Sequence, residues 1–251
     1  MSSLTLRTAR LRLPSTVEAC LFDLDGVLTD TAGLHAEAWK RVFDEFLRGR
    51  PERFVPFDLE HDYLEFVDGK ERSDGVRAFL ETRNIVLPEG SPDDPPSAET
   101  VHGIGNRKNA LVLELFASRG VLPFADALAL VALLRDRRIA TAVVSASANC
   151  LDILEAARLH DRFDAVVDAR VAAKLGLRGK PQPDTFLEAA RRLGVGPRHA
   201  AVFEDAIAGI EAGRAGGFVP VVGVARRVPP EVLRAHGADV AVARLTELIE
   251  R

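Results

Sequence analysis

The sequence predicts an α/β protein: a doubly wound, Rossmann-like parallel sheet core that carries an inserted all-helical cap domain. Strand-like and helix-like segments alternate regularly after residue 122. A single isolated strand pattern comes much earlier, at residues 19–24, and only helical periodicity lies between the two regions. The 251 residues are enough for one large domain that carries a smaller insert.

The first strand is predicted at residues 19–24, where the apolar run ACLFDL ends in a turn rich in carboxylates and glycine. An apolar run without polar alternation is typical of a strand that is buried on both faces. Ligands of doubly wound proteins bind beyond the carboxyl ends of such strands. We assign residues 1–30 and 121–251 to the core, with the site beyond this strand.

The insert is predicted at residues 31–120. Its apolar residues recur at three- and four-residue spacing, without a β-branched run, which indicates helices. Segment 87–103, rich in proline, aspartate and serine, is expected to be a surface loop of open role. The three expected helices are GLHAEAWKRVFDEFL (33–47), RSDGVRAFLETR (72–83) and RKNALVLELFASRG (107–120).

After residue 122, strands alternate with helices of about ten to fifteen residues, the pattern of βαβ units in a parallel sheet. The last segment, residues 238–251, is expected to add an edge strand and a final helix. The expected strands are IATAVVSA (139–146), FDAVVDA (163–169), HAAVFED (199–205) and FVPVVGV (218–224), and the expected helices are ADALALVALLRDRR (125–138), LDILEAARL (151–159), DTFLEAARRLG (184–194) and AIAGIEAGRAG (206–216).

The composition excludes several classes of protein. Thirty-three basic and 37 acidic side chains leave a net charge of −4, which gives no reason to expect nucleic acid or an anionic membrane as partner. Two cysteines, Cys20 and Cys150, cannot form a disulfide framework. Residues 1–16 lack the hydrophobic region of a signal peptide, and no run of 18 apolar residues occurs. We expect a cytoplasmic protein.

Four polar clusters are predicted at the ends of four strands. Taken alone, each has an ordinary alternative: a strand-end turn, a helix N-cap, or a solvated lysine in a loop. The clusters are Asp23, Asp25 and Gly26; Ser145, Ala146 and Ser147; Lys180; and Glu204 with Asp205.

Together the four clusters predict a phosphoryl-transfer site. Consecutive parallel strands end along one rim, so the carboxylates, hydroxyls and single ammonium converge there. Clustered carboxylates repel one another unless a cation lies among them, and Mg²⁺ prefers oxygen ligands and leaves room for a phosphate. Backbone N–H groups and the lysine suit the remaining phosphate oxygens.

Four segments resemble the motifs of the haloacid dehalogenase superfamily, in order and across nearly the whole chain: LFDLDGVLTDT, VVSAS, GKPQPD and VFEDAIAGI. Within it, FDLDGVLTDTAGLHAEAW, SASAN and GKPQPDTF are most similar to the β-phosphoglucomutase branch, whose helical cap is inserted after the first motif. The resemblance implies Mg²⁺-dependent transfer through an aspartyl-phosphate.

The resemblance also assigns roles to the core residues. Asp23 would be the nucleophile, and Asp25 the general acid and base. Mg²⁺ would be held by Asp23, the backbone carbonyl of Asp25 and Asp205, with Glu204 in support. The transferring phosphoryl group would bind to Ser145 and Lys180, and the same rim would include Gly26, Ala146, Ser147 and Asn149.

The cap residues would select the substrate. In the pattern T-D-T-x-x-x-H-x-x-x-W, His35 would help to position Asp25 and the sugar phosphate, and Trp39 either lines the pocket or belongs to the cap core. Arg72 would hold the non-transferring phosphate, for which a guanidinium is better suited than an ammonium. The segment Gly69, Lys70 and Arg72 leaves open which cation meets phosphate, and Lys108 resembles a substrate-contacting lysine.

Three functions compete. The first is a mutase that interconverts β-D-glucose 1-phosphate and glucose 6-phosphate, and the second is a sugar-phosphate phosphatase of the same superfamily. The third is a non-catalytic module that binds sugar phosphates, which the complete set of carboxylates disfavours. In each case we expect a monomer whose partner is a small phosphorylated sugar, and the preferred sugar and anomer stay open.

Overall fold

The computed structural model describes residues 10–51 and 53–250. Its centre is a six-stranded parallel sheet in the order β4-β3-β2-β5-β6-β7. The predicted fold class is therefore confirmed, with the last strand at one edge as expected. The strands are β2 (Ala19–Phe22), β3 (Ala140–Val144), β4 (Ala165–Val167), β5 (Ala200–Glu204), β6 (Val221–Val224) and β7 (Val240–Val242).

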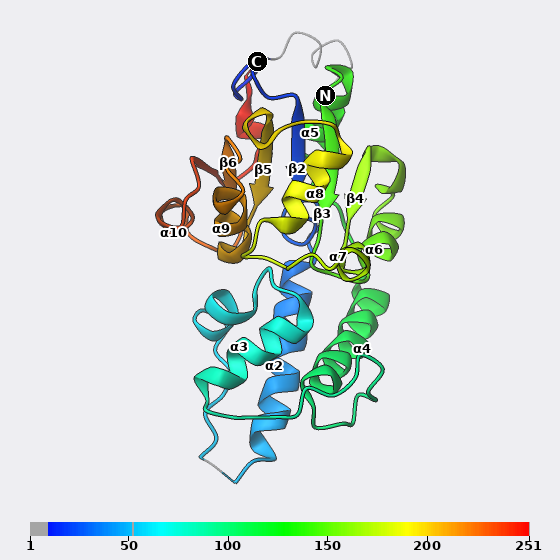
Figure 1. Cartoon of the computed structure of the whole chain (residues 1–251), viewed down its shortest axis with the longest axis vertical. Coiled ribbons are helices and arrows are strands. Elements are labelled where there is room, and N and C mark those ends of the chain that lie inside the picture. Colours follow the sequence, from blue (N-terminus) through cyan, green and yellow to red (C-terminus); the bar gives the residue numbers. More distant parts are fainter. Residues whose placement is uncertain (1–9, 52, 251) are drawn as a thin grey trace.

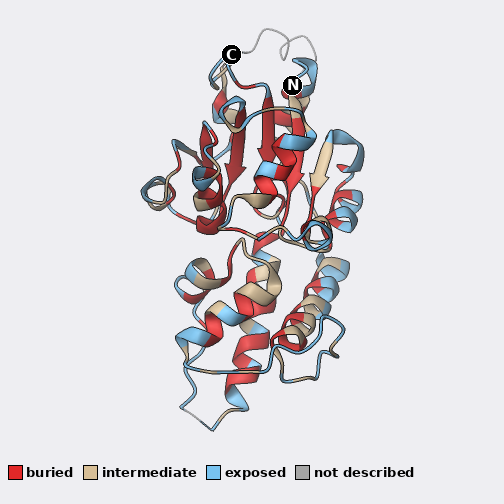
Figure 2. Ribbon diagram, in the orientation of Figure 1, coloured by how far each residue is buried: buried red, intermediate tan, exposed pale blue. Residues whose placement is uncertain are grey.

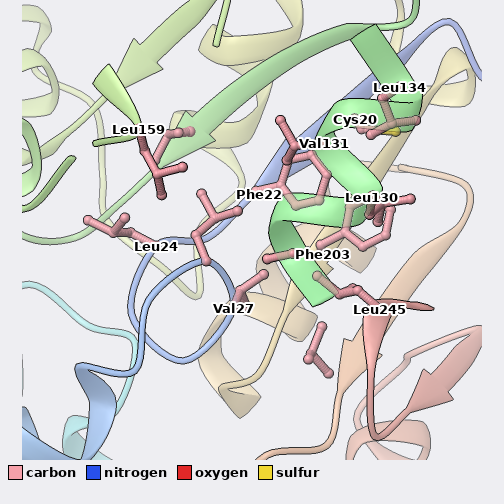
Figure 3. Close-up of a cluster of buried hydrophobic side chains, with 14 of the residues drawn as sticks. Cys20, Phe22, Leu24, Val27, Leu130, Val131, Leu134, Leu159, Phe203 and Leu245 are labelled. Atoms are coloured by element: carbon pink, nitrogen blue, oxygen red, sulfur yellow. The ribbon is translucent and has the colours of Figure 1, made fainter. Parts of the chain in front are cut away.

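Strand β2 lies inside the sheet, between β3 and β5, and its four residues are all buried. Cys20 and Phe22 face one hydrophobic cluster, and Ala19 and Leu21 face another. Figure 3 shows the first cluster, in which the Phe22 ring stacks on Phe203 of β5 with 4.4 Å between ring centroids. This two-sided burial explains why the strand reads as a continuous apolar run.

Helices cover both faces of the sheet. One face is covered by α5 (Ala125–Asp136) and α6 (Cys150–Ala156), whose apolar residues belong to the first cluster. The other face is covered by α8 (Asp184–Arg192), α9 (Ile207–Ala215) and α10 (Pro230–Ala235). Figure 2 shows the inner strands of the sheet as buried, edge strand β4 as mostly intermediate, and the outer sides of these helices as exposed, the arrangement of a doubly wound domain.

The helical insert joins β2 to α5 and lies beyond one end of the sheet (Figure 1). It has its own aromatic core, in which Phe43 packs against Trp39, Phe57 and Phe79 with ring centroids at most 5.0 Å apart. The insert consists of α2 (Ala32–Arg48), the π-helical turn η1 (Tyr63–Val67), α3 (Arg72–Thr82) and α4 (Val101–Arg119).

Short elements complete the fold. Strands β1 (Arg10–Leu11) and β8 (Ile249–Glu250) form a small antiparallel pair outside the main sheet. Within the described ranges, the helices are too short or too polar to cross a membrane. The remaining elements are α7 (Ala169–Leu175) and the 3₁₀ turns η2 (His160–Arg162), η3 (Pro197–His199) and η4 (Leu245–Leu248).

Two predicted boundaries are wrong. Helix α4 begins at Val101 rather than residue 107, because the Thr100 side chain accepts a hydrogen bond from the Gly103 N–H and caps the helix. The loop therefore ends before residue 101. The predicted final helix is only the turn η4, which passes directly into β8 and pairs with β1. Residues 1–9 and 251, included in the predicted core, lie outside the described residues.

Candidate active site

The end of β2 places two carboxylates at the rim of the sheet. The Asp23 N–H donates to the Phe203 carbonyl (2.9 Å), which extends the pairing with β5 by one residue. The chain then turns at Gly26, whose φ of +90° favours glycine. A Cβ there would lie 1.9 Å from Asp205 Oδ2, so the backbone of this turn packs directly on the carboxylate that follows β5.

Lys180 connects the carboxylates beneath the site. Its ammonium lies 2.5 Å from Asp23 Oδ1 and also donates to Glu204, and the side chain is buried. Burial lowers the pKa of Lys180, but Asp23 and Glu204 outweigh this effect, so its pKa is raised above the ordinary value. The expectation that Lys180 directly follows a strand is wrong, because helix α7 separates it from β4.

Three buried carboxylates are arranged as a cation site. Oxygens of Asp23, Glu204 and Asp205 lie within 4.8 Å of one another. Burial raises the pKa of Asp23 well above its usual range, with Lys180 opposing this effect. Across residues 10–51 and 53–250 no hydrogen bond to the Asp205 carboxylate is formed. One lysine cannot neutralise all three carboxylates, so these residues can hold a divalent cation.

The hydroxyl cluster after β3 forms a pair of tight turns. Ser145 Oγ accepts a hydrogen bond from the Ser147 N–H, and Ser147 Oγ accepts one from the Asn149 N–H, each 3.1 Å long. Helix α6 begins only at Cys150, so neither serine is its N-cap. In the same way, Asp205 does not cap α9, whose N-cap is Ala206. A helix N-cap therefore does not explain the presence of Ser145, Ser147 or Asp205.

Asp25 is oriented from the insert. Thr31, the N-cap residue of α2, donates its hydroxyl to Asp25 Oδ1. His35 Nε2 lies 3.4 Å from the same oxygen, and the Lys108 ammonium donates to His35 Nδ1 over 2.7 Å. Because an ammonium only donates, Nδ1 accepts and the imidazole proton is on Nε2, facing Asp25. Burial and Lys108 lower the pKa of His35 to about 4, so the ring is neutral.

The insert brings two cations into the cleft. Lys108 is buried, and burial lowers its pKa to about 7. Its ammonium lies 5.0 Å from the centre of the Trp39 ring, which both lines the cleft and stacks within the cap core. Arg72, at the start of α3, is partly buried, and burial lowers its pKa. Its guanidinium forms no hydrogen bond or ion pair within the described part of the chain.

The segment before α3 approaches the core closely. Gly69 has a φ of +72°, and a Cβ there would lie 2.9 Å from the Ala206 Cβ of the core. Lys70 lines the cleft but donates to the Glu65 carbonyl (3.2 Å) on its own side of it. Arg72 therefore has the freer cationic group of the two.

Sequence reasoning missed several cleft residues. Tyr63 is the first residue of η1 and Asp68 directly follows η1, and a hydrogen bond joins their side chains. Burial raises the pKa of Asp68 to about 6, a rise that the Tyr63 hydrogen bond opposes. Asn109 accepts a hydrogen bond from Asn149 (2.8 Å) and so links α4 to the core. The sequence VDGK offered a carboxylate beside Gly69, and NRKN an amide beside Lys108, but neither had a predicted partner.

The cleft lies between the insert and the core, and its empty volume, counted to its open mouth, is about 640 Å³. Gly26, Ser145, Lys180 and Glu204 support it from beneath. The predicted residues that line it are Asp23, Asp25, His35, Trp39, Gly69, Lys70, Arg72, Lys108, Ala146, Ser147, Asn149 and Asp205.

Known proteins are similar over most of the chain. Residues 17–217 match the family model described as haloacid dehalogenase-like hydrolase. A β-phosphoglucomutase of Mycobacterium tuberculosis is 50% identical over 97% of this chain and 96% of the relative, and a fructose-1-phosphate phosphatase of Escherichia coli is 32% identical over 79% and 92%. The crystal structure of β-phosphoglucomutase from Clostridium difficile superposes with a TM-score of 0.71 at 28% identity, covering 92% of this chain and 93% of that one. This chain is therefore an enzyme of the haloacid dehalogenase-like hydrolase family.

Proposed function

We propose that this protein is a Mg²⁺-dependent β-phosphoglucomutase, which interconverts β-D-glucose 1-phosphate and glucose 6-phosphate through an aspartyl-phosphate. The observation that carries the proposal is the cleft with anion-binding groups on both walls. On the core side the turn at residues 146–149 lines the cleft above Lys180, and on the insert side Arg72 and Lys108 line it. A substrate that carries one phosphate needs only the first set, whereas a bisphosphate intermediate uses both.

Arg72 supports the second anion subsite. An arginine without a partner in a partly buried position pays for lost hydration unless an anion binds there. Lys108 is buried against a neutral imidazole, which also leaves its charge available to a ligand. The distal phosphate of a bound sugar bisphosphate satisfies both groups, and the 50% identical mycobacterial β-phosphoglucomutase supports that choice of substrate.

The carboxylate cluster would hold Mg²⁺ through Asp23, Asp205 and the Asp25 carbonyl, with Glu204 in support. When bound, the cation would lower the repulsion between the Asp23 carboxylate and an incoming phosphoryl group. Lys180 would hold Asp23 in place and offset charge on the phosphoryl oxygens. Ser145 and Ser147 would present their hydroxyl groups and Ala146 its N–H to the same oxygens, with Asn149 on the same rim, close to the turn at Gly26.

The transfer would take two steps. An Asp23 oxygen forms a bond to phosphorus of the sugar bisphosphate, the ester P–O bond breaks, and Asp25 gives its proton to the leaving sugar oxygen. In the return step, Asp25 removes a proton from the hydroxyl of the second sugar, and that oxygen takes the phosphoryl group from Asp23. Thr31 and His35 would keep the Asp25 carboxyl group in place for both proton transfers.

The decisive experiment supplies β-glucose 1-phosphate, Mg²⁺ and a trace of β-glucose 1,6-bisphosphate to the purified protein. The expected products are glucose 6-phosphate with little inorganic phosphate, and Asp23→Asn is expected to form neither. Release of inorganic phosphate without glucose 6-phosphate would contradict the mutase and favour the phosphatase. No turnover of any sugar phosphate, combined with tight binding of one, would favour the non-catalytic module.

The phosphatase is the second candidate because a relative at 32% identity is a fructose-1-phosphate phosphatase. The two reactions share the first step and differ in whether water or a sugar hydroxyl reaches the aspartyl-phosphate. We also propose that the enzyme acts as a cytoplasmic monomer. One chain supplies every residue of the cleft, and its two cysteines are free and buried. Light scattering tests the monomer directly.

A further inference from the structure

A carboxylate on the insert faces the cation site of the core. Asp68 follows the π-helical turn η1 and is only 9% exposed, in the wall of the cleft. The Tyr63 side chain forms a hydrogen bond with it. In the insert segment VDGKERSDG (67–75) the sequence gives this aspartate no role, and neither the metal cluster nor the proposed transfer steps use it.

Asp68 and Asp205 flank a close contact between insert and core. Gly69 follows Asp68 and Ala206 follows Asp205, and a Cβ on Gly69 would lie 2.9 Å from the Ala206 Cβ. Burial raises the pKa of Asp205, and among the neighbouring charges Asp68 has the largest effect, ahead of Glu204 and Asp23. The two carboxylates therefore come close only because the insert is seated on the core.

Little positive charge offsets this approach. Two cations act on Asp68: Arg227, from the loop after β6, whose guanidinium lies 5.6 Å from the Tyr63 ring centre, and Lys108 of α4. Neither forms an ion pair with Asp68 among residues 10–51 and 53–250. Lys180 is already shared by Asp23 and Glu204. Seating the insert thus brings like charges together in a poorly hydrated place, which opposes closure.

We propose that Asp68 is a positioning residue through which a divalent cation in the core site closes the insert over the cleft. A divalent cation among Asp23, Glu204 and Asp205, together with the ammonium of Lys180, cancels the net negative charge that Asp68 meets there. Mg²⁺ keeps several of its waters, so the Asp68 carboxylate can accept hydrogen bonds from this hydration shell without being a direct ligand. By linkage, closure then tightens cation binding by the same factor.

The inference rests on the cation site of the proposed function, but not on the mutase reaction. Its test uses Mg²⁺ alone, without any sugar phosphate. Calorimetry gives the Mg²⁺ dissociation constant, and small-angle X-ray scattering gives the radius of gyration with and without Mg²⁺. The fluorescence of the single tryptophan, Trp39, which lines the cleft, reports closure independently. The variants are Asp68→Asn, Asp68→Glu and the control Glu65→Gln, an exposed carboxylate on the same turn.

Wild type is expected to contract when Mg²⁺ binds. Asp68→Asn is expected to be more compact than wild type without Mg²⁺, to contract little further, and to bind Mg²⁺ about fivefold or more weakly. Asp68→Glu, which keeps the charge, is expected to retain the contraction, and Glu65→Gln to match wild type in every measurement. A protein that forms no glucose 6-phosphate in the sugar-phosphate assay can still show all of these Mg²⁺ results, so each proposal can fail without the other.

Three outcomes would overturn the proposal. The first is an Asp68→Asn variant with the Mg²⁺ affinity and contraction of wild type. The second is that variant with unchanged Mg²⁺ binding but a raised KM for sugar phosphate, which would make Asp68 a ligand of a sugar hydroxyl instead. The third is equal loss in Asp68→Asn and Asp68→Glu, folded by circular dichroism, because charge would then not be the cause.

Discussion

Two side chains of the insert, Thr31 and His35, lie against the Asp25 carboxylate, so the proposed general acid is oriented but still reachable from the cleft. We expect Asp25→Asn to lower kcat for β-glucose 1-phosphate by ~10²–10⁴-fold, since an amide cannot supply the proton. Phosphorylation of the enzyme by acetyl phosphate, whose leaving group needs no proton, should fall much less. Rapid-quench kinetics with both donors measures the difference, and equal losses would argue against an acid role.

We expect the buried ammonium of Lys108 to lower the free energy of unfolding, although it contributes to binding of the distal phosphate. Burial lowers its pKa in the folded protein to about 7, below the ordinary value near 10.5. Below pH 7 the amine is charged in both states, so the cost of burying the charge is complete; between pH 7 and 10.5 the folded amine is neutral and the cost declines. Lys108→Met should therefore unfold at higher temperature than wild type at pH 6.

This advantage of Lys108→Met should shrink above pH 7, by at most about 1.4 kcal/mol per pH unit. Urea unfolding of both proteins between pH 6 and 10 measures the difference in the free energy of unfolding. A constant difference across that range would show that the pKa of Lys108 is not lowered. The same variant should lose most of its activity, because the ammonium would no longer meet the distal phosphate.

The site could be predicted from the sequence wherever residues follow buried strands in recognisable motifs. Asp23 and Asp205 follow β2 and β5, which pair side by side, so their convergence follows from strand order. Asp68 could not be found in this way, because its position depends on how the insert is seated on the core. The hydrogen bond between Asn109 and Asn149 has the same cause, since it joins residues 40 positions apart on different units.

At the scale of elements, α4 contains two glycines whose surroundings differ. A Cβ at Gly105 would meet only the Arg72 Cβ, at 3.6 Å, whereas at Gly103 it would lie 2.3 Å from the Ala98 carbonyl oxygen. Alanine is favoured over glycine inside a helix by ~0.5–1 kcal/mol. We expect Gly105→Ala to raise the melting temperature and Gly103→Ala to lower it, as thermal unfolding by circular dichroism would measure.

Element boundaries were the weakest part of the sequence prediction. The run from residue 87 to 103 ends in His102 and Gly103, which read as loop, yet the Thr100 cap starts α4 within it. The last segment has the apolar spacing of a helix, but pairing of Ile249 with Leu11 holds its end extended. In both cases a contact made by a neighbouring segment overrides local preference.

At the scale of the whole molecule, the hydrogen bond from Asn149 to Asn109 is a direct link between core and insert. Removing it should let water reach the aspartyl-phosphate more often. We expect Asn109→Ala to raise the ratio of inorganic phosphate to glucose 6-phosphate several-fold. Asn106→Ala is the matched control, since that side chain bonds only to Pro92 and Asp94 of the insert. An equal ratio in both variants would contradict the role of the link.

The central place of β2 has a consequence for biosynthesis. Its two neighbours, β3 and β5, begin at residues 140 and 200, so the strand that precedes Asp23 leaves the ribosome long before the strands that flank it. At about 5–20 residues per second, the wait for β5 is roughly ten seconds or more. During that time the aromatic cluster of the insert can assemble from contiguous chain. The insert of the nascent protein can therefore fold first. Meanwhile the apolar run 19–24 stays exposed to solvent, so it is the segment for which a chaperone would be most useful.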